Sequence, residues 1–431
     1  MSAVLDLDGG PRPLRGSIRL PGDKSISHRA LLFAGLAEGR SRITGLGTGG
    51  DVAATAAALR ALGVAVARQD GAVIVDSPGL AAWSEPDDVV DCGNSGTTIR
   101  VLTGALAGRP FCTVLTGDAS LRRRPMARVA DPLRAMGARI DGRDGGSRAP
   151  LVVRGGALTG RRHELTVASA QVKSAILLAG LQAEGPTEVH EPLRSRDHTE
   201  RMLRALGVPV EVDGTVVRIG AGVPEPCSIA VPGDPSSAAF FAVAAAITPG
   251  SEFVCPGLAG NPTRIGFVAV LRRMGADIDF VPTGEVCGEP VGELRVRGSA
   301  LRATVIEGAE IPAVIDEIPA LAVAAAFADG VTEIRDAAEL RVKESDRITT
   351  VATLIGAIGV ECETRPDGLR ITGGQPHAAA HASGGDHRIA MAAAVASIAV
   401  PGRSRIAGWD AVVSSFPEFA DRLADLAGGF S

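Results

Sequence analysis

The sequence is 431 residues long, with 44 Lys and Arg against 49 Asp and Glu, and its formal net charge is −5. That acidic balance argues against a general nucleic-acid binder, which needs a basic surface. The length exceeds one ordinary hydrophobic core, so two domains are expected. The most apolar stretch, 238–247, is too short to span a bilayer, and the first residues lack a secretory pattern. We therefore expect a cytoplasmic protein.

A short phrase recurs along the chain and predicts a surface helix that ends at a glycine before a strand. Its copies are ALRALGVAV (58–66), PLRAMGARI (132–140), MLRALGVPV (202–210), VLRRMGADI (270–278) and TLIGAIGVEC (353–362), with a degenerate sixth at 420–429. The glycines concerned are Gly63, Gly137, Gly207, Gly275 and Gly359. Glycine suits this position because the chain turns through a left-handed conformation after the helix.

A second phrase alternates with the first and predicts a buried helix. It consists of a Gly- or Ser-rich turn followed by a run of small apolar residues. Its copies span 21–37, 93–108, 168–183, 232–247, 315–330 and 383–398. A helix with Ala, Gly, Ile and Leu on all its faces belongs in a core.

Together the two phrases predict an α/β fold of six units, each of about 70 residues. LPGDKS and VPGDPS, at 20–25 and 231–236, lie half a chain apart, so the units group in threes. We expect one domain at 20–231 and a similar one formed by 1–19 with 232–431, with the chain crossing between them near residues 21 and 232. A cleft between two such domains is a favoured ligand site, and we expect the active site there.

The turn PGDKSISHR, at 21–29, is the first candidate site. A helix that starts near Ser25 offers backbone N–H groups to an anion, and Lys24 and Arg29 add positive charge. The alternative is a capped helix with a solvated lysine and arginine. The matching turn in the second half has Pro235 in place of Lys24, so packing alone does not require the charge. We therefore favour an anion site.

Four other turns that precede helices also carry polar groups. They are NSGTTIR (94–100), RRRPM (122–126), SAQVK (169–173) and GDHR (385–388). The first fits an anion cradle or a plain helix cap, and the second is a solvated charge run unless the following proline holds Arg124 extended. Gln171 is unusual at the mouth of an apolar helix unless its amide has a partner.

Acidic and basic residues come together in the second half of the chain. Asp316 and Glu317 stand in an apolar run, and the segment 341–347 follows. Lys343 and Arg347, four residues apart, are expected on one helical face with Glu344 beside them. Buried carboxylates near cations are candidate acid and base groups, and the alternative is an exposed helix with paired charges.

These turns meet at one end of each domain if the buried helices run roughly parallel. The cations brought together would be Lys24, Arg29, Arg100, Arg124, Lys343, Arg347 and Arg388. A strongly anionic set of ligands accounts for such a cluster in an acidic protein.

The residues that carry these features resemble one family, 5-enolpyruvylshikimate-3-phosphate synthase, over nearly the whole chain. The motifs are PGDKSISHR, GNSGTTIR, RRPM, SAQVKSA, NPTR (261–264), ELRVKESDR and GDHRIAM. The resemblance implies two inside-out α/β domains, each built from three βαβαββ units and joined by two crossover segments. It implies transfer of the enolpyruvyl group of phosphoenolpyruvate to the 5-hydroxyl of shikimate 3-phosphate. It also implies no metal or organic cofactor, a monomer, and no nucleic-acid or membrane partner.

The resemblance also assigns roles to individual residues. It implies that Asp316, Glu344 and Lys24 are catalytic. Shikimate 3-phosphate would be bound by Lys24, Ser25, Arg29, Ser169, Ala170, Gln171, Arg196, Asp316 and Lys343. Phosphoenolpyruvate would be bound by Lys24, Asn94, Gly96, Arg124, Gln171, Arg347 and Arg388.

Some positions distinguish branches of this family. RDHTE (196–200), NPTR and SAQVK resemble the class II branch, and many other members have a lysine where this chain has Ser414. Class II members that tolerate glyphosate often have an alanine where this chain has Gly96. The class II motifs thus favour tolerance, whereas Gly96, which has no methyl group, leaves room for the inhibitor. Because a steric effect acts directly on binding, we give Gly96 more weight and expect glyphosate to compete with phosphoenolpyruvate here.

Two other functions can be weighed from the sequence alone, and each lacks a feature that it requires. The sister transferase acting on UDP-N-acetylglucosamine would carry a reactive cysteine near Arg124, and residues 113–130 contain none. A ligand-binding paralogue without activity would have lost charges, yet Lys24, Asp316 and Glu344 are all present.

Overall fold

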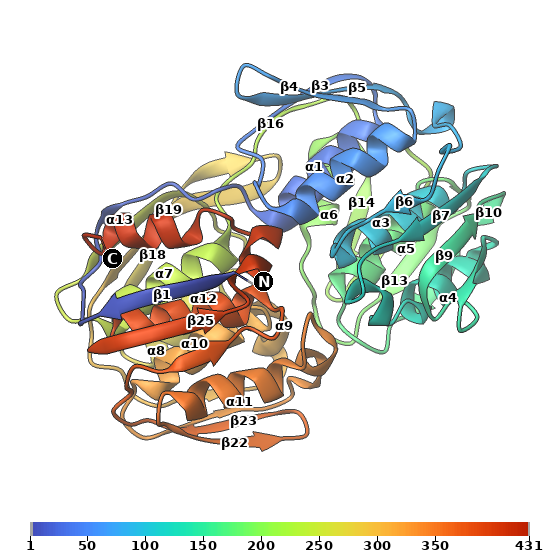
Figure 1. Ribbon diagram of the computed structural model, residues 1–431. Coiled ribbons are helices and arrows are strands. Elements are labelled where there is room, and N and C mark those ends of the chain that lie inside the picture. The colour runs from blue at the N-terminus through green and yellow to red at the C-terminus, as the bar shows by residue number, and fades with distance from the viewer. Residues whose placement is uncertain (1–2, 430–431) are drawn as a thin grey trace. The chain divides into compact units, whose positions relative to one another are not determined.

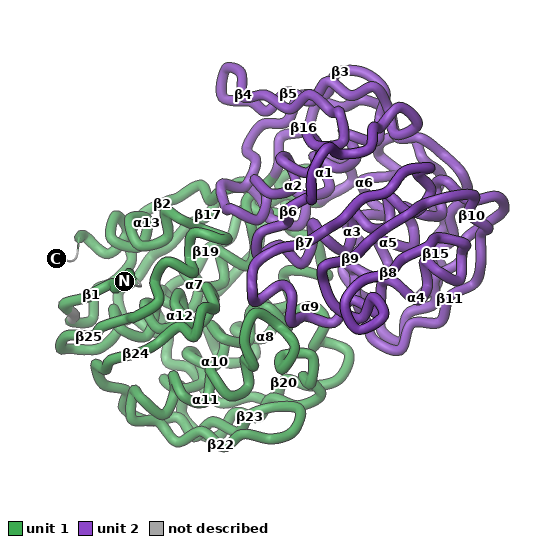
Figure 2. Tube along the Cα trace, turned by 45° about the vertical axis from the view of Figure 1, so that its right-hand side comes forward, with its two compact units in different colours: residues 1–21, 232–284, 290–431 green, residues 22–231, 285–289 purple. Residues whose placement is uncertain are grey.

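The computed structural model describes residues 3–429, and the chain divides into two compact units. Unit 1 comprises residues 1–21, 232–284 and 290–431, and unit 2 comprises 22–231 and 285–289, as Figure 2 shows. The sequence-based boundary at 20–231 differs from that of unit 2 by two residues at its start. The short segment 285–289, which the sequence places in the second domain, belongs to unit 2. It carries none of the repeated phrases, so no sequence pattern indicates this.

Unit 2 contains three four-stranded sheets. In order across the first sheet, the strands are β16 (Ser228–Ala230), β3 (Glu38–Thr44), β5 (Ala72–Pro78) and β4 (Ala65–Gln69). The second sheet has β6 (Val90–Asp91), β7 (Cys112–Thr116), β9 (Arg148–Arg154) and β8 (Arg139–Arg143). The third has β11 (Arg162–Glu164), β13 (Thr187–His190), β15 (Val216–Ile219) and β14 (Val210–Asp213). Each sheet pairs its first two strands in parallel and the others antiparallel. A short parallel pair joins β10 (Leu158–Thr159) to β12 (Ala183–Glu184).

Unit 1 repeats this arrangement with two four-stranded sheets and one three-stranded sheet. The strands are β18 (Asp277–Val286), β19 (Glu289–Arg297), β17 (Glu252–Ala259) and β2 (Arg15–Ser17); β20 (Val305–Ile306), β21 (Val331–Ile334), β23 (Gly368–Thr372) and β22 (Glu361–Arg365); and β1 (Val4–Gly9), β25 (Gly402–Ala407) and β24 (Ala380–Ala382). The N-terminal strands β1 and β2 thus complete sheets whose other strands come from the second half of the chain.

Six helices form the cores of the two units. In unit 2 they are α1 (Lys24–Leu36), α3 (Gly96–Leu106) and α5 (Ala170–Gly180), and in unit 1 they are α7 (Pro235–Ile247), α10 (Ile318–Ala326) and α12 (His387–Ile398). Every residue of α7 and α12 is buried. Their small side chains allow neighbouring helices to approach closely, and α7, α10 and α12 all contact one another (Figure 1). The predicted two-domain α/β fold with buried helices is confirmed.

A second set of helices alternates with the core helices along the chain. They are α2 (Gly50–Ala61), α4 (Ala127–Met136), α6 (His198–Ala205), α8 (Gly266–Arg273), α11 (Arg347–Ala357) and α13 (Phe419–Leu426), with a one-turn helix α9 (Ile311–Val314) before α10. All five repeat glycines have a positive φ, between +82° and +119°, as the sequence predicts.

The segment 341–347 is not the single helix that the four-residue spacing of its cations indicated. A 3-10 helix, η4 (Ala338–Val342), ends before Lys343, and α11 begins afresh at Arg347. The reason is local, because the Asp346 carboxylate accepts the N–H groups of Ile348 and Thr349 and so caps a new helix.

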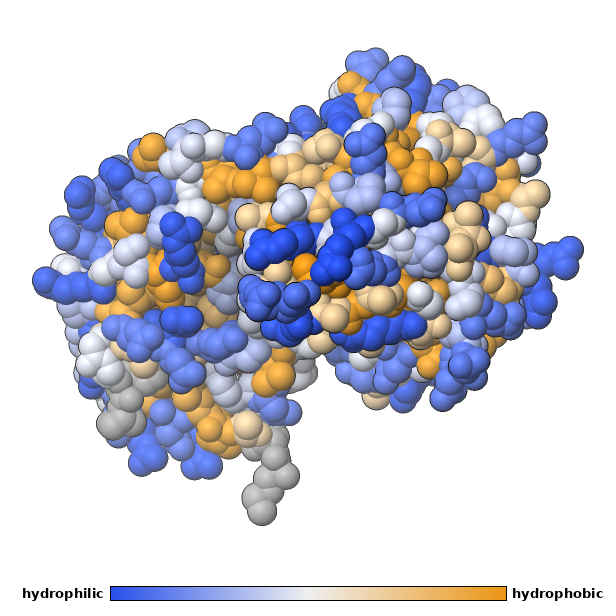
Figure 3. All heavy atoms as spheres, turned by 90° about the horizontal axis from the view of Figure 1, so that it is seen from above, coloured by the Kyte–Doolittle hydropathy of each residue, from blue (hydrophilic) through white to orange (hydrophobic). Residues whose placement is uncertain are grey.

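Among residues 3–429, no helix is both long enough and apolar enough to cross a membrane. On the face shown in Figure 3, hydrophobic residues stand in separate groups among hydrophilic ones.

Two glycines three residues apart give a direct test of the repeat. Gly359 has φ +82°, and a methyl group there would also meet the His377 ring, whereas Gly356 lies on an exposed face of α11 with nothing near it. We expect Gly359→Ala to lower the free energy of unfolding by about 1–2 kcal/mol. Gly356→Ala should raise it by about 0.5–1 kcal/mol. Urea unfolding of both variants measures this, and shifts of the same sign would contradict the left-handed turn.

Candidate active site

In unit 2, the start of α1 carries a lysine held by a buried carboxylate. The Asp23 side chain caps the helix by accepting the N–H of Ile26 at 2.7 Å. Lys24 Nζ lies 2.5 Å from Asp51 Oδ2, and the Asp51 side chain is 7% exposed. The alternative of a freely solvated lysine is therefore wrong. Asp51, in the first turn of α2, was missed because nothing in the local sequence links it to Lys24.

Arg29, one turn further along α1, is a buried cation bound to neutral groups. Its guanidinium donates to Thr199 Oγ1 and Ser174 Oγ, both at 2.7 Å, and to the Ser25 carbonyl at 3.0 Å. Burial lowers the pKa of Arg29 to about 10, although the charge of Glu200 acts in the opposite direction. A guanidinium that is still protonated at neutral pH, and hydrogen-bonded only to uncharged atoms, suits an anionic ligand.

The amide of Gln171 has the partners that its position at the mouth of an apolar helix calls for. Arg100 Nη1 donates to Gln171 Oε1 at 2.6 Å, and Gln171 Nε2 donates to Thr97 Oγ1 at 3.0 Å. These contacts join the first turns of α3 and α5. Ser169 caps α5 by accepting the N–H of Val172, and Ala170 is the first helical residue.

Arg124 has the extended backbone that the following proline predicts, with φ −71° and ψ 147°. Its Nη2 donates to Asn94 Oδ1 at 2.6 Å. A Cβ atom built on Gly96 would lie 3.0 Å from Arg100 Nη1 and 3.1 Å from Arg124 Nη1. The absent side chain at Gly96 therefore leaves room for both guanidinium groups at the start of α3.

Arg196 is half-buried and lies in the segment between β13 and α6. Its charge contributes to lowering the pKa of Arg29, after the larger effect of burial. Two predicted phosphate-binding arginines are thus close enough in unit 2 to interact. A pocket in this unit, lined by residues 128, 132, 162–167, 169 and 172, also reaches the predicted Ser169.

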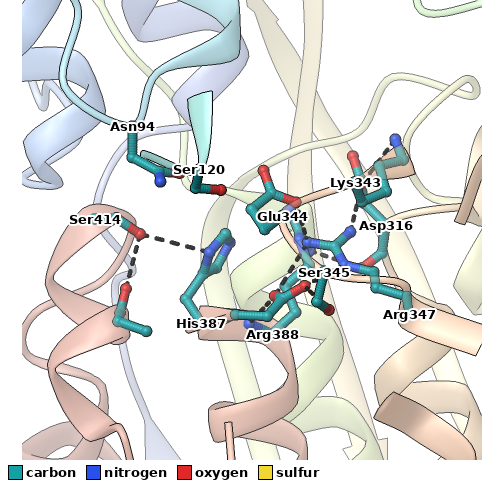
Figure 4. Close-up of polar contacts among 12 residues, drawn as sticks. Asn94, Ser120, Asp316, Lys343, Glu344, Ser345, Arg347, His387, Arg388 and Ser414 are labelled. Carbon is teal, nitrogen blue, oxygen red and sulfur yellow. Dashed lines mark hydrogen bonds and ion pairs between the residues drawn. The ribbon is translucent and has the colours of Figure 1, made fainter. Parts of the chain in front are cut away.

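In unit 1, the predicted acid and base residues meet around one arginine, as Figure 4 shows. Arg347 is 1% exposed and donates to Glu344 Oε2 at 2.6 Å and to Asp316 Oδ1 at 3.1 Å. Lys343 Nζ lies 3.4 Å from the same Asp316 oxygen. The two cations therefore share a carboxylate, although they do not lie on one helix.

A third carboxylate that holds Arg347 was not identified from the sequence. Asp386 is fully buried and accepts from Arg347 Nε at 2.8 Å and from Ser345 Oγ at 3.0 Å. Burial alone would raise the pKa of Asp386, but the charge of Arg347 lowers it overall. Its only sequence signal was its place before His387 and Arg388 in the GDHR turn, where it looks like a simple helix cap.

Arg388 reaches the same segment as the acid and base residues. Its Nη1 donates to the Asp316 carbonyl at 2.8 Å and lies 3.9 Å from Glu317 Oε1. Glu317 is fully buried and accepts a hydrogen bond from Ser236. Asp316 is thus held through its side chain by Arg347 and through its backbone by Arg388.

Ser414, the position at which the family resemblance predicts a lysine in many other members, belongs to the 3-10 helix η5 (Trp409–Ser414). Its hydroxyl donates to the Ala411 carbonyl at 2.8 Å and lies 3.5 Å from His387 Nδ1 (Figure 4). Among residues 3–429, no group of three or more His, Cys, Asp or Glu side chains is placed to hold a metal ion.

Comparisons with known proteins agree on one family. The model of EPSP synthase (3-phosphoshikimate 1-carboxyvinyltransferase) matches residues 9–423. A 3-phosphoshikimate 1-carboxyvinyltransferase from Gloeobacter violaceus is 55% identical over 418 residues, which cover 96% of this chain and 96% of that protein. The protein of the same name from Chloroflexus aurantiacus (strain J-10-fl) is 53% identical over 421 residues, covering 96% and 97%.

Solved structures show the same likeness. An EPSP synthase from Acinetobacter baumannii superposes with a TM-score of 0.88 and 41% identity, covering 99% of both chains. The enolpyruvyl transferase NikO from Streptomyces tendae superposes with a TM-score of 0.78, covering 99% of this chain and 98% of that one. At 21% identity, NikO shows a likeness of fold alone.

The buried contact between Asp386 and Arg347 should make stability depend on pH. We expect Asp386→Asn, which can still cap α12, to lower the free energy of unfolding at pH 7 by about 3 kcal/mol. Because the folded-state pKa of Asp386 is lowered, its contribution is fully present above the ordinary aspartate pKa of about 4 and is lost as the pH falls through the folded value.

The difference between wild type and Asp386→Asn should therefore shrink as the pH is lowered from 5 towards 3, measured by urea unfolding. Glu164→Gln is the control, because its ion pair with Arg162 is exposed, at 63% and 64%, and should change stability by less than about 0.5 kcal/mol. A loss in Asp386→Asn that stays constant over this pH range would mean that the charge of Asp386 is not its cause.

Proposed function

This chain belongs to the EPSP synthase family, and from that premise we propose how its residues carry out the reaction. It transfers the enolpyruvyl group of phosphoenolpyruvate to the 5-hydroxyl of shikimate 3-phosphate and releases phosphate. The observation that carries the proposal is the cluster in which Arg347 contacts both Asp316 and Glu344. Two carboxylates held by one buried cation supply an acid and a base at fixed positions.

The reaction proceeds in two stages. In the addition, the 5-hydroxyl oxygen bonds to C2 of phosphoenolpyruvate, the hydroxyl proton passes to Asp316, and C3 gains a proton from Glu344, with Lys24 as its partner. In the elimination, the bond from C2 to the phosphate oxygen breaks, C3 returns a proton to Glu344, and the leaving phosphate takes the proton held by Asp316. The products are the enolpyruvyl ether and inorganic phosphate.

The anionic substrates are assigned to the helix starts of both units. In unit 2, Ser25, Arg29, Ser169, Ala170, Gln171 and Arg196 bind shikimate 3-phosphate, together with Lys24 and with Asp316 and Lys343 of unit 1. Asn94, Gly96, Arg124, Gln171 and Lys24 bind phosphoenolpyruvate with Arg347 and Arg388 of unit 1. Support comes from the first turns of α1, α3 and α5, where capped helix N-termini stand beside cations.

Arg347 links substrate binding to proton delivery in this scheme. It donates to Glu344 Oε2 at 2.6 Å, so it holds the side chain that is proposed to act at C3. Phosphoenolpyruvate, an anion bound by the same guanidinium, competes with Glu344 for it. Substrate binding thereby loosens the Glu344 contact and frees this side chain to act at C3.

The sister transferase acting on UDP-N-acetylglucosamine is not favoured by the family match or by the named relatives. Its reactive cysteine has no counterpart in residues 113–130. The monomeric state and the cytoplasmic location are further parts of the proposal, and both rest on the family resemblance.

Phosphate release from phosphoenolpyruvate tests the function directly. The purified protein is mixed with phosphoenolpyruvate and either shikimate 3-phosphate or UDP-N-acetylglucosamine. We expect phosphate release, and an enolpyruvyl ether detected by mass spectrometry, with the first acceptor alone. Phosphate release with UDP-N-acetylglucosamine would overturn the proposal. So would the absence of phosphate release with both acceptors.

Glu344→Gln tests the proton donor. The amide keeps the shape of the side chain but cannot deliver a proton, so we expect kcat to fall by about 10²–10⁴-fold. Incorporation of solvent deuterium at C3 should slow by a similar factor. Glu361→Gln, at an exposed position on β22, is the control and should match wild type in both measurements. Deuterium incorporation at the wild-type rate in Glu344→Gln would exclude this role.

Gly96→Ala tests the space at the start of α3. The added methyl would lie 3.0–3.1 Å from the guanidinium groups of Arg100 and Arg124, which must shift. Glyphosate should compete with phosphoenolpyruvate in the wild type. In the variant, the inhibition constant should rise more than KM for phosphoenolpyruvate, by a factor equivalent to about 1–3 kcal/mol. Inhibition kinetics at varied phosphoenolpyruvate measure both, and an equal rise would mean that this turn does not discriminate between them.

A further inference from the structure

A buried lysine in unit 2 lies between two buried glutamates, outside the residues assigned above. Lys173 Nζ, on α5, lies 2.7 Å from Glu191 Oε2 and 2.8 Å from Glu200 Oε1. The three side chains are only 1–2% exposed. Burial alone would lower the pKa of Lys173, but the two carboxylates raise it overall, so the lysine is charged. The triad therefore carries a net charge of −1 when all three groups are ionised.

Stability alone does not account for this triad. Buried ions lose their hydration, and well-packed apolar side chains of similar volume are often as stabilising or more so. One glutamate would also suffice to neutralise one lysine. The positions of the two glutamates in the chain point to a different purpose.

The glutamates stand at the two ends of the segment that carries Arg196. Glu191 directly follows β13, and Glu200 lies in the first turn of α6. By contacting both, Lys173 ties the ends of the segment 191–200 to α5. Within the segment, Asp197 accepts hydrogen bonds from Arg194 at 2.7 Å and from Arg201 at 2.9 Å, which further fix its course.

The neighbours of the triad in the sequence hold the other arginine. Ser174 follows Lys173, Thr199 precedes Glu200, and their hydroxyl oxygens lie 2.7 Å apart. Both hydroxyls accept hydrogen bonds from Arg29 at 2.7 Å. The negative charge of Glu200 also opposes the loss of charge that burial would impose on Arg29. The triad is thus linked to Arg29 through the hydroxyl groups of Ser174 and Thr199. It is linked to Arg196 because that residue lies within the segment 191–200.

We propose that Lys173 is a positioning residue for the phosphate of shikimate 3-phosphate, acting by fixing Arg29 and Arg196 relative to one another. Two like charges repel, and the excess negative charge of the triad offsets that repulsion before the ligand arrives. Phosphoenolpyruvate shares Lys24 and Gln171 with shikimate 3-phosphate. Its other residues in unit 2, Asn94, Gly96 and Arg124, lie at or near the start of α3 and do not contact the triad. The inference rests on the proposed function, because it takes shikimate 3-phosphate as the ligand.

The test separates positioning from simple charge. Lys173→Met removes the tie and makes the triad more negative, whereas Lys173→Met/Glu200→Gln removes the tie but keeps the net charge at −1. In both variants we expect KM and the calorimetric Kd for shikimate 3-phosphate to rise at least tenfold, with KM for phosphoenolpyruvate changed less than threefold. Wild-type affinity in the charge-matched variant would overturn the proposal, as would an equal rise for both substrates.

Two further variants guard against a general loss of structure. Ile176→Ala, at a fully buried position on the same helix, should lower Tm without altering the ratio of the two KM values. Glu191→Gln keeps the ion pair of Lys173 with Glu200 and should fold even if Lys173→Met does not. It should raise KM for shikimate 3-phosphate several-fold, and a value unchanged from wild type in a folded Glu191→Gln protein would also overturn the proposal.

The wild-type control separates this inference from the proposed function. A wild-type protein that makes no product from shikimate 3-phosphate and phosphoenolpyruvate refutes the function, and the inference with it. Normal turnover in the wild type, with no selective effect in the variants, refutes the role of Lys173 alone.

Discussion

A helix that is buried on every side must still satisfy the backbone N–H groups of its first turn, and this requirement places most of the chemistry in this protein. Asp23, Ser95, Ser169, Asp234 and Asp386 each accept backbone N–H groups at the start of a core helix. The sixth core helix, α10, has a proline near its start, which has no N–H to satisfy. Polar residues cannot stand elsewhere on these helices without a partner, so they gather at this end.

The two units differ in the balance of charge around their buried arginines. In unit 2, Arg29 is satisfied by hydroxyl and carbonyl oxygens, and the nearest carboxylates act on it from a distance. In unit 1, Arg347 contacts three carboxylates directly. A cation held by neutral groups is suited to receive an anion, whereas a cation held by carboxylates is suited to orient them. In the proposed reaction, Arg29 accordingly binds substrate alone, whereas Arg347 both orients the acid–base carboxylates and binds phosphoenolpyruvate.

The features that the sequence predicts well are those that depend on residues close together in the chain. The glycine turns after Gly63 and Gly359, and the all-apolar core helices, follow from local sterics and periodicity. The break between Lys343 and Arg347 was missed because a single capping aspartate outweighed a regular charge spacing. The carboxylate partners of Lys24 and Lys173 lie 18 to 27 residues away in the sequence. No local sequence pattern predicts an ion pair over that separation. Individual residue roles in binding and catalysis remain predictions from the family resemblance, now with a geometry that can be tested.

Strands β1 and β2 pair with strands from the second half of the chain, and this affects the order in which the protein can fold during synthesis. Residues 22–231 are contiguous and supply all three core helices of unit 2, so this part can become compact first. Strand β2 has to wait for β17, and β1, beginning at Val4, pairs with β25, whose partner residue is Ala407. The earliest strands to leave the ribosome are therefore among the last to be paired. Until then the backbone edges of β1 and β2 are exposed and open to pairing with other chains.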